Sequence, residues 1–294
     1  MSKYKEIKAA LLGAGTVGGG VYKLVERRAA EMPDKVGAEL KITKVLVKNL
    51  QKKREGIPSE VLTDDWEGII HDPEISIVIE LMGGVEPART YILQALEAGK
   101  NVVTANKDLL AEHGQELMEA AERNHRDLCF EAAVGGGIPI IRPLKECLAG
   151  NEITEVMGIV NGTTNYILTK MTQEGWDFDD ALKEAQRLGF AEADPTADVE
   201  GQDACRKIAI LASIISGKYV DFEEIYTEGI TKITTEDMQY AKALGMNIKL
   251  LAECKHVDGT LYAGVAPVLL HAEHPLYSVN GVFNAVFVKG NMLG

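Results

Sequence analysis

The segment that most constrains the fold is a glycine turn near the start of the chain. A short apolar run at 7–12 leads directly into it, and the next apolar side chains recur at the spacing of a helix. A G-x-G-x-x-G turn between strand and helix holds a dinucleotide pyrophosphate on backbone N–H groups at the helix N-terminus. The segment therefore predicts a dinucleotide site. Its residues are Gly13, Ala14, Gly15, Thr16, Val17 and Gly18, and the helical stripe is Val17, Val21, Leu24 and Val25.

Strand-like and helical segments alternate over the rest of the first 130 residues. This alternation predicts a parallel, doubly wound sheet. The strand-like runs are 40–47, 75–81, 101–104 and 128–130, with helices expected at 17–28, 87–98 and 112–124.

The pattern changes after the Gly135-Gly136-Gly137 run, where helices alternate less regularly with strands and the last strands follow one another by hairpin-length connections. The expected fold class is α/β: a Rossmann-type doubly wound parallel sheet in residues 1–130, then an α+β domain with a mainly antiparallel sheet in residues 131–294. Helices are expected at 139–148, 164–173, 177–188, 202–216 and 235–246, and strands at 155–160, 248–255, 261–270 and 281–289.

Charge and apolar content narrow the class of partner. The formal net charge of −13 argues against nucleic-acid binding, because neutralising phosphates requires a basic face. No apolar run approaches the roughly 20 residues that span a bilayer, and the start lacks the features of a secretory signal. Four scattered cysteines without a Cys-x-x-Cys pair indicate buried thiols rather than a zinc site or disulfides. We expect a cytoplasmic protein without nucleic-acid or membrane partners.

The end of the second predicted strand bears on the choice of dinucleotide. A carboxylate there binds the ribose 2′-hydroxyl of NAD, whereas a basic residue accommodates the 2′-phosphate of NADP. In this chain the strand ends with the sequence Val47-Lys48-Asn49, and Lys52, Lys53 and Arg54 follow before the first acid, Glu55. The segment favours NADP. NAD, with a merely solvated basic loop, is the alternative.

The segment from Gly189 to Lys207 is rich in acids and ends in a helix. Asp203 and Lys207 are four residues apart and so share one helix face. An exposed ion pair is one interpretation, but the same stripe continues through Ile210 and Ile214, which favours a pair that points toward protein. A partly desolvated lysine suits proton transfer at an alcohol or carbonyl oxygen, and the acids can hold an α-ammonium group.

Two further segments carry polar groups at turns. Lys107 follows a predicted central strand, where the crevice of a doubly wound sheet lies, and can reach a substrate carboxylate or cofactor ribose; a surface lysine is the alternative. Glu131 precedes the Gly135-Gly136-Gly137 turn, which can present the oxygen ligands that hard cations prefer. For this second segment the pattern alone favours a structural turn.

These segments together resemble homoserine dehydrogenase along the whole chain. Two motifs of the second half, Val160–Ile167 and Gly189–Lys207, are far more specific for this family than the glycine turn. The resemblance implies reversible oxidation of L-homoserine to L-aspartate 4-semialdehyde, on the route to threonine, methionine and isoleucine. The matching motifs are Gly13–Gly18, Met82-Gly83-Gly84, Thr104–Lys107, Glu131–Pro139, Val160–Ile167 and Gly189–Lys207.

The resemblance also implies roles for individual residues. It makes Lys207 the general acid/base and Lys107 a second lysine of the site. Homoserine would contact Glu192, Asp198, Asp203, Gly162 and Thr163. The cofactor would contact the glycine turn, Lys48, Gly83, Gly84, Lys107 and Gly189. A monovalent cation, sodium or potassium, would be held mainly by the carbonyl oxygens of Glu131, Val134, Gly136 and Ile138, in place of the purely structural turn. A homodimer formed through the sheet of the second domain is also implied.

The chain departs from the family in two respects. Phe190 stands where many members have tyrosine, so a hydroxyl is missing. The chain also ends before the family's last nucleotide-domain segment and before any ACT domain, so the 131–294 domain is expected to be C-terminally incomplete.

Two alternatives to this function stay open. An aspartate-semialdehyde-type dehydrogenase would need an activated cysteine. Cys129 and Cys205, however, fall in a predicted strand and a predicted helix. A dinucleotide-binding regulatory chain without turnover is the other alternative.

Overall fold

The computed structural model describes residues 3–292 and divides the chain into two compact units, Met1–Phe130 and Glu131–Gly294. Residues 1–2 and 293–294 lie outside the described part.

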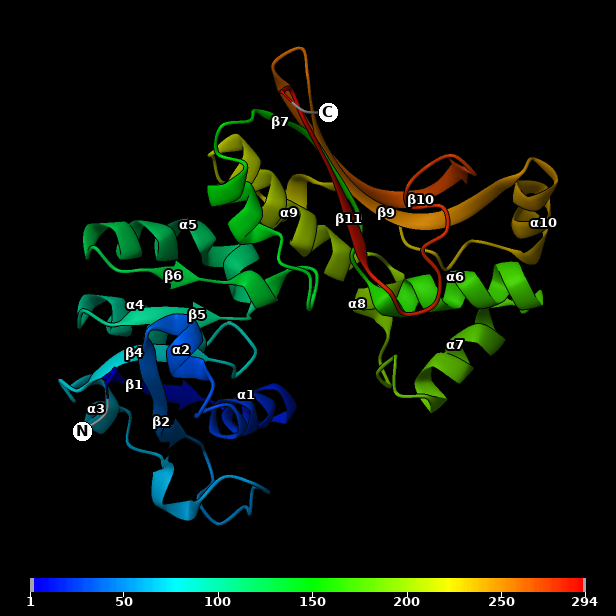
Figure 1. Cartoon of the computed structure of the whole chain (residues 1–294). Coiled ribbons are helices and arrows are strands. Elements are labelled where there is room, and N and C mark those ends of the chain that lie inside the picture. The colour runs from blue at the N-terminus through cyan, green and yellow to red at the C-terminus, as the bar shows by residue number, and fades with distance from the viewer. Residues whose placement is uncertain (1–2, 293–294) are drawn as a thin grey trace. The chain divides into compact units, whose positions relative to one another are not determined.

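The first unit is built on a six-stranded sheet in the order β3-β2-β1-β4-β5-β6, in which every pairing is parallel (Figure 1). The order reverses direction between β1 and β4, and ligands of open α/β sheets bind at such a switch point. The strands are β1 (Lys5–Leu12), β2 (Ala38–Leu46), β3 (Leu62–Thr63), β4 (Ile75–Glu80), β5 (Asn101–Thr104) and β6 (Leu128–Cys129). The helices are α1 (Thr16–Arg27), α2 (Met32–Val36), α3 (Trp66–Ile70), α4 (Ala88–Glu97) and α5 (Lys107–Arg123).

The central strands are buried because helices follow each of them. Ala9, Ala10, Leu11 and Leu12 of β1 are all fully inaccessible, as is Val78 of β4. Strands that are covered on both faces have nearly continuous apolar sequences. The predicted doubly wound sheet is therefore confirmed.

Two details of the first unit differ from expectation. The inward face of α1 is Gly18, Tyr22 and Val25, whereas Val17 and Leu24 are exposed, because the turn requires Gly18 to face the sheet. Helix α5 begins at Lys107 rather than at 112, because Asn106 caps it by accepting a hydrogen bond from Leu109 N at 3.2 Å.

The second unit contains a five-stranded sheet in the order β11-β7-β9-β10-β8. All its pairings are antiparallel except the short one between β10 and β8. The mainly antiparallel sheet is confirmed. The strands are β7 (Ile153–Ile159), β8 (Tyr226–Thr227), β9 (Met246–Val257), β10 (Thr260–His271) and β11 (Ala285–Gly290). The helices are α6 (Gly162–Glu174), α7 (Phe178–Arg187), α8 (Thr196–Val199), α9 (Gln202–Ser216) and α10 (Thr235–Ala243).

The hairpin expectation holds for one pair of strands only. Strands β9 and β10 are joined by Asp258 and Gly259, both with positive φ, as a two-residue hairpin turn requires. Strand β11 pairs with β7 instead of β10 (Figure 1). The strand expected at 281–289 begins only at Ala285, after Gly281 with φ of +67°.

Other boundaries shift for local reasons. Helix α10 ends at Ala243 instead of 246, because Gly245 has a positive φ and Met246 already belongs to β9. The helix expected at 139–148 contains a π-helical turn at Pro143–Cys147. The thiols of Cys205 and Cys254 are buried as expected, but those of Cys129, on the edge strand β6, and Cys147 are exposed.

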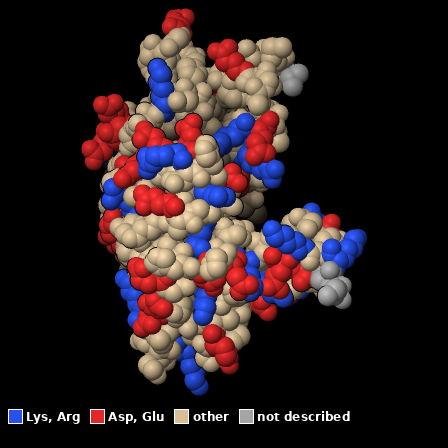
Figure 2. Space-filling model, turned by 90° about the vertical axis from the view of Figure 1, so that its left-hand side faces the viewer, with Lys and Arg blue, Asp and Glu red and all other residues tan. Residues whose placement is uncertain are grey.

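No helix within residues 3–292 combines the length and apolar character needed to cross a membrane. On the face shown in Figure 2, basic and acidic side chains are intermixed rather than gathered in a single-sign patch.

Candidate active site

The glycine turn joins β1 to α1 in a geometry that only glycine fits at two positions. Gly13 has φ of +93°, and a Cβ there would lie 2.7 Å from Leu81 O. A Cβ on Gly18 would lie 2.1 Å from Gly13 O, so the helix packs directly on the turn. A Cβ on Gly15, which caps α1, would meet no heavy atom within 4 Å. Gly15 thus leaves the helix N-terminus open to an anionic ligand.

A cleft of about 600 Å³ opens beside this turn. Its walls combine the start of the turn with the end of β2, the basic loop after β2, and residues that follow β4. Of the residues expected to bind the cofactor, four line it. The lining residues are Gly13, Ala14, Gly15, Leu46, Val47, Lys48, Lys52, Arg54, Asp64, Leu81, Met82, Pro87 and Tyr91.

The basic loop is held by its own backbone. Arg54 Nη1 donates to Asn49 O at 3.0 Å and to Lys52 O at 2.7 Å. Asn49 Oδ1 accepts from Gln51 N at 2.8 Å. These bonds fold the loop so that its cations border the cleft, which suits an additional phosphate on the ligand.

Buried Glu80, which the sequence analysis did not single out, fixes the ends of β4 and β5. Its Oε1 accepts from Met82 N at 2.7 Å, and its Oε2 accepts from Thr104 Oγ1 at 2.6 Å. Asn106 Nδ2 donates to Gly84 O at 2.7 Å. The network holds the Gly83-Gly84 loop against the segment that starts α5 at Lys107. The role of Glu80 has a sequence signal: an acidic residue at the end of an apolar strand, opposite a threonine on the next strand.

In the second unit, Lys207 and Asp203 form an ion pair that is largely withdrawn from solvent. Lys207 Nζ donates to Asp203 Oδ2 at 2.6 Å and to Val160 O at 2.7 Å. The side chain of Lys207 is 15% exposed and that of Asp203 is 8% exposed. The expectation that this helical stripe points toward protein is confirmed.

Asn161, also missed by the sequence analysis, joins the acids to this pair. Its Nδ2 donates to Asp198 Oδ1 at 2.7 Å and to Asp203 Oδ2 at 2.9 Å. Its Oδ1 accepts from Thr164 N at 2.9 Å and so caps α6. An asparagine at a predicted helix start indicates a cap, but its contact with residues about forty positions away requires the fold.

Thr163 and Gly162, predicted to line the homoserine pocket, lie in the first turn of α6. Thr163 Oγ1 donates to Phe190 O at 2.8 Å, and a Cβ on Gly162 would lie 2.8 Å from Val282 O. The ring of Phe190 packs against Tyr166 with centroids 5.1 Å apart. The structure therefore brings five predicted residues together around the N-terminus of α6: Gly162, Thr163, Asp198, Asp203 and Lys207.

Two other predicted residues lie outside that cluster. Glu192 is exposed, and its carbonyl oxygen accepts from Gln186 Nε2 at 3.1 Å. Gly189 is exposed two residues after α7, with φ of +77°, and is not among the residues lining the cleft of the first unit.

The turn from Glu131 to Ile138 uses the Glu131 carboxylate as a helix cap. Its oxygens accept from Ile140 N at 2.5 Å, Ile141 N at 2.8 Å and Arg142 N at 2.9 Å. Gly135 and Gly136 both have positive φ, and a Cβ on Gly136 would meet no heavy atom within 4 Å. Within residues 3–292, no three His, Cys, Asp or Glu side chains gather in a metal-binding group.

The two buried cysteines, Cys205 and Cys254, do not have the environment of acyl-transfer nucleophiles. Burial raises the pKa of the Cys205 thiol and raises that of Cys254 to about 12. A catalytic cysteine needs its thiolate stabilised instead. This weighs against the aspartate-semialdehyde-type alternative.

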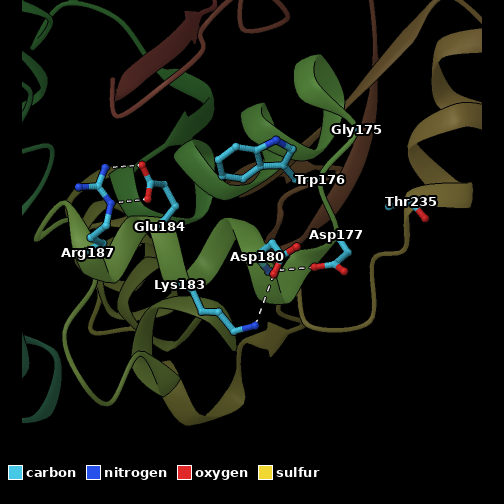
Figure 3. Close-up of a pocket in the computed structure, with 8 residues that line it drawn as sticks. All are labelled: Gly175, Trp176, Asp177, Asp180, Lys183, Glu184, Arg187 and Thr235. Carbon is cyan, nitrogen blue, oxygen red and sulfur yellow. Dashed lines mark hydrogen bonds and ion pairs between the residues drawn. The ribbon is translucent and has the colours of Figure 1, made fainter.

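A second hollow, of about 720 Å³, lies along α7 and the residues before it (Figure 3). Four of its charged side chains form pairs: Arg187 bonds Glu184 through two nitrogens, and Lys183 approaches Asp180 at 3.4 Å. None of the predicted site residues lines it. The other lining residues are Gly175, Trp176, Asp177 and Thr235.

A parallel sheet with a glycine turn at its switch point, followed by a unit with a desolvated lysine–aspartate pair, defines an NAD(P)-dependent oxidoreductase. Residues 13–131 match the family model described as "Homoserine dehydrogenase, NAD binding domain", and residues 139–294 match the model described as "Homoserine dehydrogenase". The chain belongs to the homoserine dehydrogenase family.

Individual relatives agree with this assignment. The chain is 50% identical to the homoserine dehydrogenase of Bacillus subtilis over 291 residues, which cover 99% of this chain and 67% of that protein. It is 50% identical to the enzyme of Synechocystis, covering 98% of this chain and 67% of that protein. A crystal structure of a homoserine dehydrogenase from Thiobacillus denitrificans superposes with a TM-score of 0.93 at 46% identity, covering 99% of this chain and 68% of that one. The comparisons support neither alternative function.

Proposed function

We propose that the chain interconverts L-homoserine and L-aspartate 4-semialdehyde by direct hydride transfer. The observation that carries the proposal is the Lys207–Asp203 pair, in which Lys207 Nζ lies 2.6 Å from Asp203 Oδ2 and is largely withdrawn from solvent. Val160 O accepts a second hydrogen bond from the same Nζ. A lysine so placed can exchange a proton with a substrate oxygen without competition from bulk water.

In oxidation, a hydride leaves C4 of homoserine, and the hydroxyl proton passes to Lys207 Nζ in its deprotonated form, which restores the ion pair with Asp203. A bound nicotinamide supplies the hydride acceptor at its C4. In the reverse direction Lys207 returns the proton to the carbonyl oxygen. Lys107 is proposed as a second lysine that contacts the substrate or the cofactor.

The acids provide the binding groups for the substrate's ammonium. Asp198 and Asp203 are bridged by Asn161, and Asp203 accepts from Lys207, while Gly162 and Thr163 form the adjoining helix start. We propose that these residues and Glu192 orient homoserine. Exposed Glu192 would join the others when the substrate is bound.

The proposed cofactor is NADP, bound at the cleft of the first unit. The glycine turn, Gly83, Gly84, Lys107 and Gly189 would contact the dinucleotide, and Lys48 would face the 2′-phosphate. The lining of the cleft by three cations supports NADP over NAD. A structural neighbour at 30% identity and a TM-score of 0.82, covering 98% of this chain and 89% of that one, is a hyperthermophilic archaeal homoserine dehydrogenase in complex with NADPH.

We expect Lys48→Glu to raise the KM for NADP about tenfold and to change the KM for NAD by less than about twofold, because only NADP carries the 2′-phosphate. Lys53→Glu is the matched control, since it makes the same charge change in the same loop but does not line the cleft. Steady-state kinetics with both dinucleotides measure the effect. A preference that does not move in Lys48→Glu removes the argument for NADP.

A monovalent cation, sodium or potassium, is proposed at the turn formed by Glu131, Val134, Gly136 and Ile138. Backbone carbonyls would be its main ligands, since the Glu131 carboxylate already accepts three N–H bonds. The room beside Gly136 supports the proposal. The cation would fix this turn at the start of the second unit.

A homodimer formed through the sheet of the second unit is also proposed. Tyr262 is 54% exposed and Val268 37% exposed, and they lie on one face of β10, an even number of residues apart. Exposed apolar side chains on one sheet face are typical of a protein interface. A mass in solution equal to twice that of one chain is the expected result of light scattering.

The proposed function is tested by homoserine-dependent formation of NADPH at alkaline pH, measured in NaCl, KCl and choline chloride at equal ionic strength. Turnover in the sodium or potassium salt and a lower rate in choline are expected. Turnover that is equal in all three salts would leave the dehydrogenase function intact and contradict the cation site. Cofactor binding without turnover would favour the regulatory alternative.

A further inference from the structure

Lys249 is a buried lysine that the proposed chemistry does not use. It lies on β9 and is 1% exposed. Its Nζ donates to Val279 O at 2.5 Å, Asn280 Oδ1 at 2.9 Å and Asn165 Oδ1 at 3.1 Å. Burial lowers the pKa of Lys249 to about 8. All three acceptors are neutral oxygens, so no carboxylate among them offsets the cost of burying the amine.

The acceptors of Lys249 belong to two segments that it ties together: helix α6 and the residues 279–283 that precede β11. Asn165 Nδ2 donates to Val279 O at 3.2 Å and to Phe283 O at 3.0 Å. Thr169 Oγ1 accepts from Gly281 N at 3.0 Å. The 279–283 segment is thus bound along the first two turns of α6.

The same segment reaches the helix terminus that carries the site. Val282 O lies so close to Gly162 that a Cβ there would be 2.8 Å from it. Gly162 is flanked by Asn161, which bridges Asp198 and Asp203, and by Thr163. The contacts therefore form a continuous path from Lys249, through the 279–283 segment, to the residues around Lys207.

We propose that Lys249 is a positioning residue for the homoserine pocket: by fixing the 279–283 segment against α6, it sets the position of Asn161 and Thr163. The inference rests on the proposed function, because it assigns a role within the same site. A lysine is suited to the task because its three N–H groups reach one acceptor on the helix and two on the segment.

The test compares variants by kinetics with homoserine and dinucleotide varied separately. Lys249→Met retains the alkyl chain and removes all three bonds, and we expect about a tenfold or larger rise in the KM for homoserine, with the KM for NADP within about twofold. Thr169→Val removes the hydroxyl that holds Gly281 N, and a smaller rise of about threefold is expected. A variant that only loosened the fold would lower the fraction of active enzyme. It would not raise the KM for homoserine while leaving the KM for NADP nearly unchanged.

Thr172→Val is the matched control. Thr172 lies one turn further along α6, and its hydroxyl also donates to the carbonyl four residues earlier, but its remaining contacts are Met238 and Asn247 rather than the 279–283 segment. Its KM for homoserine should equal that of the wild type. If Lys249→Met fails to fold, the difference in the KM for homoserine between Thr169→Val and Thr172→Val tests the proposal instead.

Two outcomes separate this inference from the function on which it rests. Equal homoserine KM values in Thr169→Val and Thr172→Val, or an equal rise in both KM values in Lys249→Met, would overturn the positioning role while leaving the enzyme's activity established. A wild-type protein without homoserine-dependent turnover would instead overturn the proposed function and, with it, this role.

Discussion

The Lys207→Arg variant is expected to lose homoserine oxidation by about 10²–10⁴-fold, the usual contribution of a positioned general acid/base. Arginine keeps the positive charge beside Asp203, but it does not deprotonate in proteins and so cannot accept the hydroxyl proton. Lys207→Ala should be equally inactive. In both variants the Kd for NADPH, measured by fluorescence titration, should stay within about twofold of the wild type.

The control for Lys207→Arg is Lys170→Arg, the same substitution at another helical lysine that pairs with an acid four residues away, Glu174. Its activity should match the wild type. Thermal unfolding of each variant separates lost chemistry from lost structure, since Lys207→Ala leaves Asp203 without its cation in a largely buried place. Activity near that of the wild type in Lys207→Arg contradicts the proton-transfer role.

The second large effect is expected at Gly18. In Gly18→Ala, the new methyl group would lie 2.1 Å from Gly13 O, a backbone atom that cannot move without opening the turn. We expect a loss of about 1–3 kcal/mol of stability, as for other overpacked sites, and at least about a tenfold weaker affinity for NADPH. Chemical denaturation and fluorescence titration measure the two quantities.

Gly20→Ala, in the same helix, provides the comparison. A Cβ at Gly20 would meet no heavy atom within 4 Å, and alanine in a helix interior is favoured over glycine by about 0.5–1 kcal/mol. Normal affinity and slightly higher stability are therefore expected. Normal NADPH binding by Gly18→Ala would show that the turn does not form the pyrophosphate site.

Local patterns were sufficient to predict the features that depend on neighbours in sequence. Gly13 and Gly18 follow from the strand-turn-helix pattern, and the predicted bounds of α9, 202–216, match those observed. The inward orientation of Lys207 followed from the apolar stripe of its helix. Each of these depends on backbone geometry over a few residues.

Contacts between distant segments could not be predicted in the same way. Asn161 bridges Asp198 and Asp203 because α6, α8 and α9 meet at one point, and Lys249 reaches Asn165 across 84 positions. Likewise β11 pairs with β7 rather than with its neighbour in sequence, because the 279–283 segment is held on α6. Such pairings follow from packing of the whole unit, which has no period in the sequence.

The glycine turn indicates a dinucleotide, and the cluster around Lys207 indicates what is done with it. Direct hydride transfer from homoserine to the dinucleotide connects these two inferences. It is tested most directly with homoserine that carries deuterium at both C4 positions, by following the label into the reduced cofactor. One deuterium at C4 of the nicotinamide for each homoserine oxidised is the predicted result. Reduced cofactor without the label, or no homoserine-dependent reduction at all, would contradict the account.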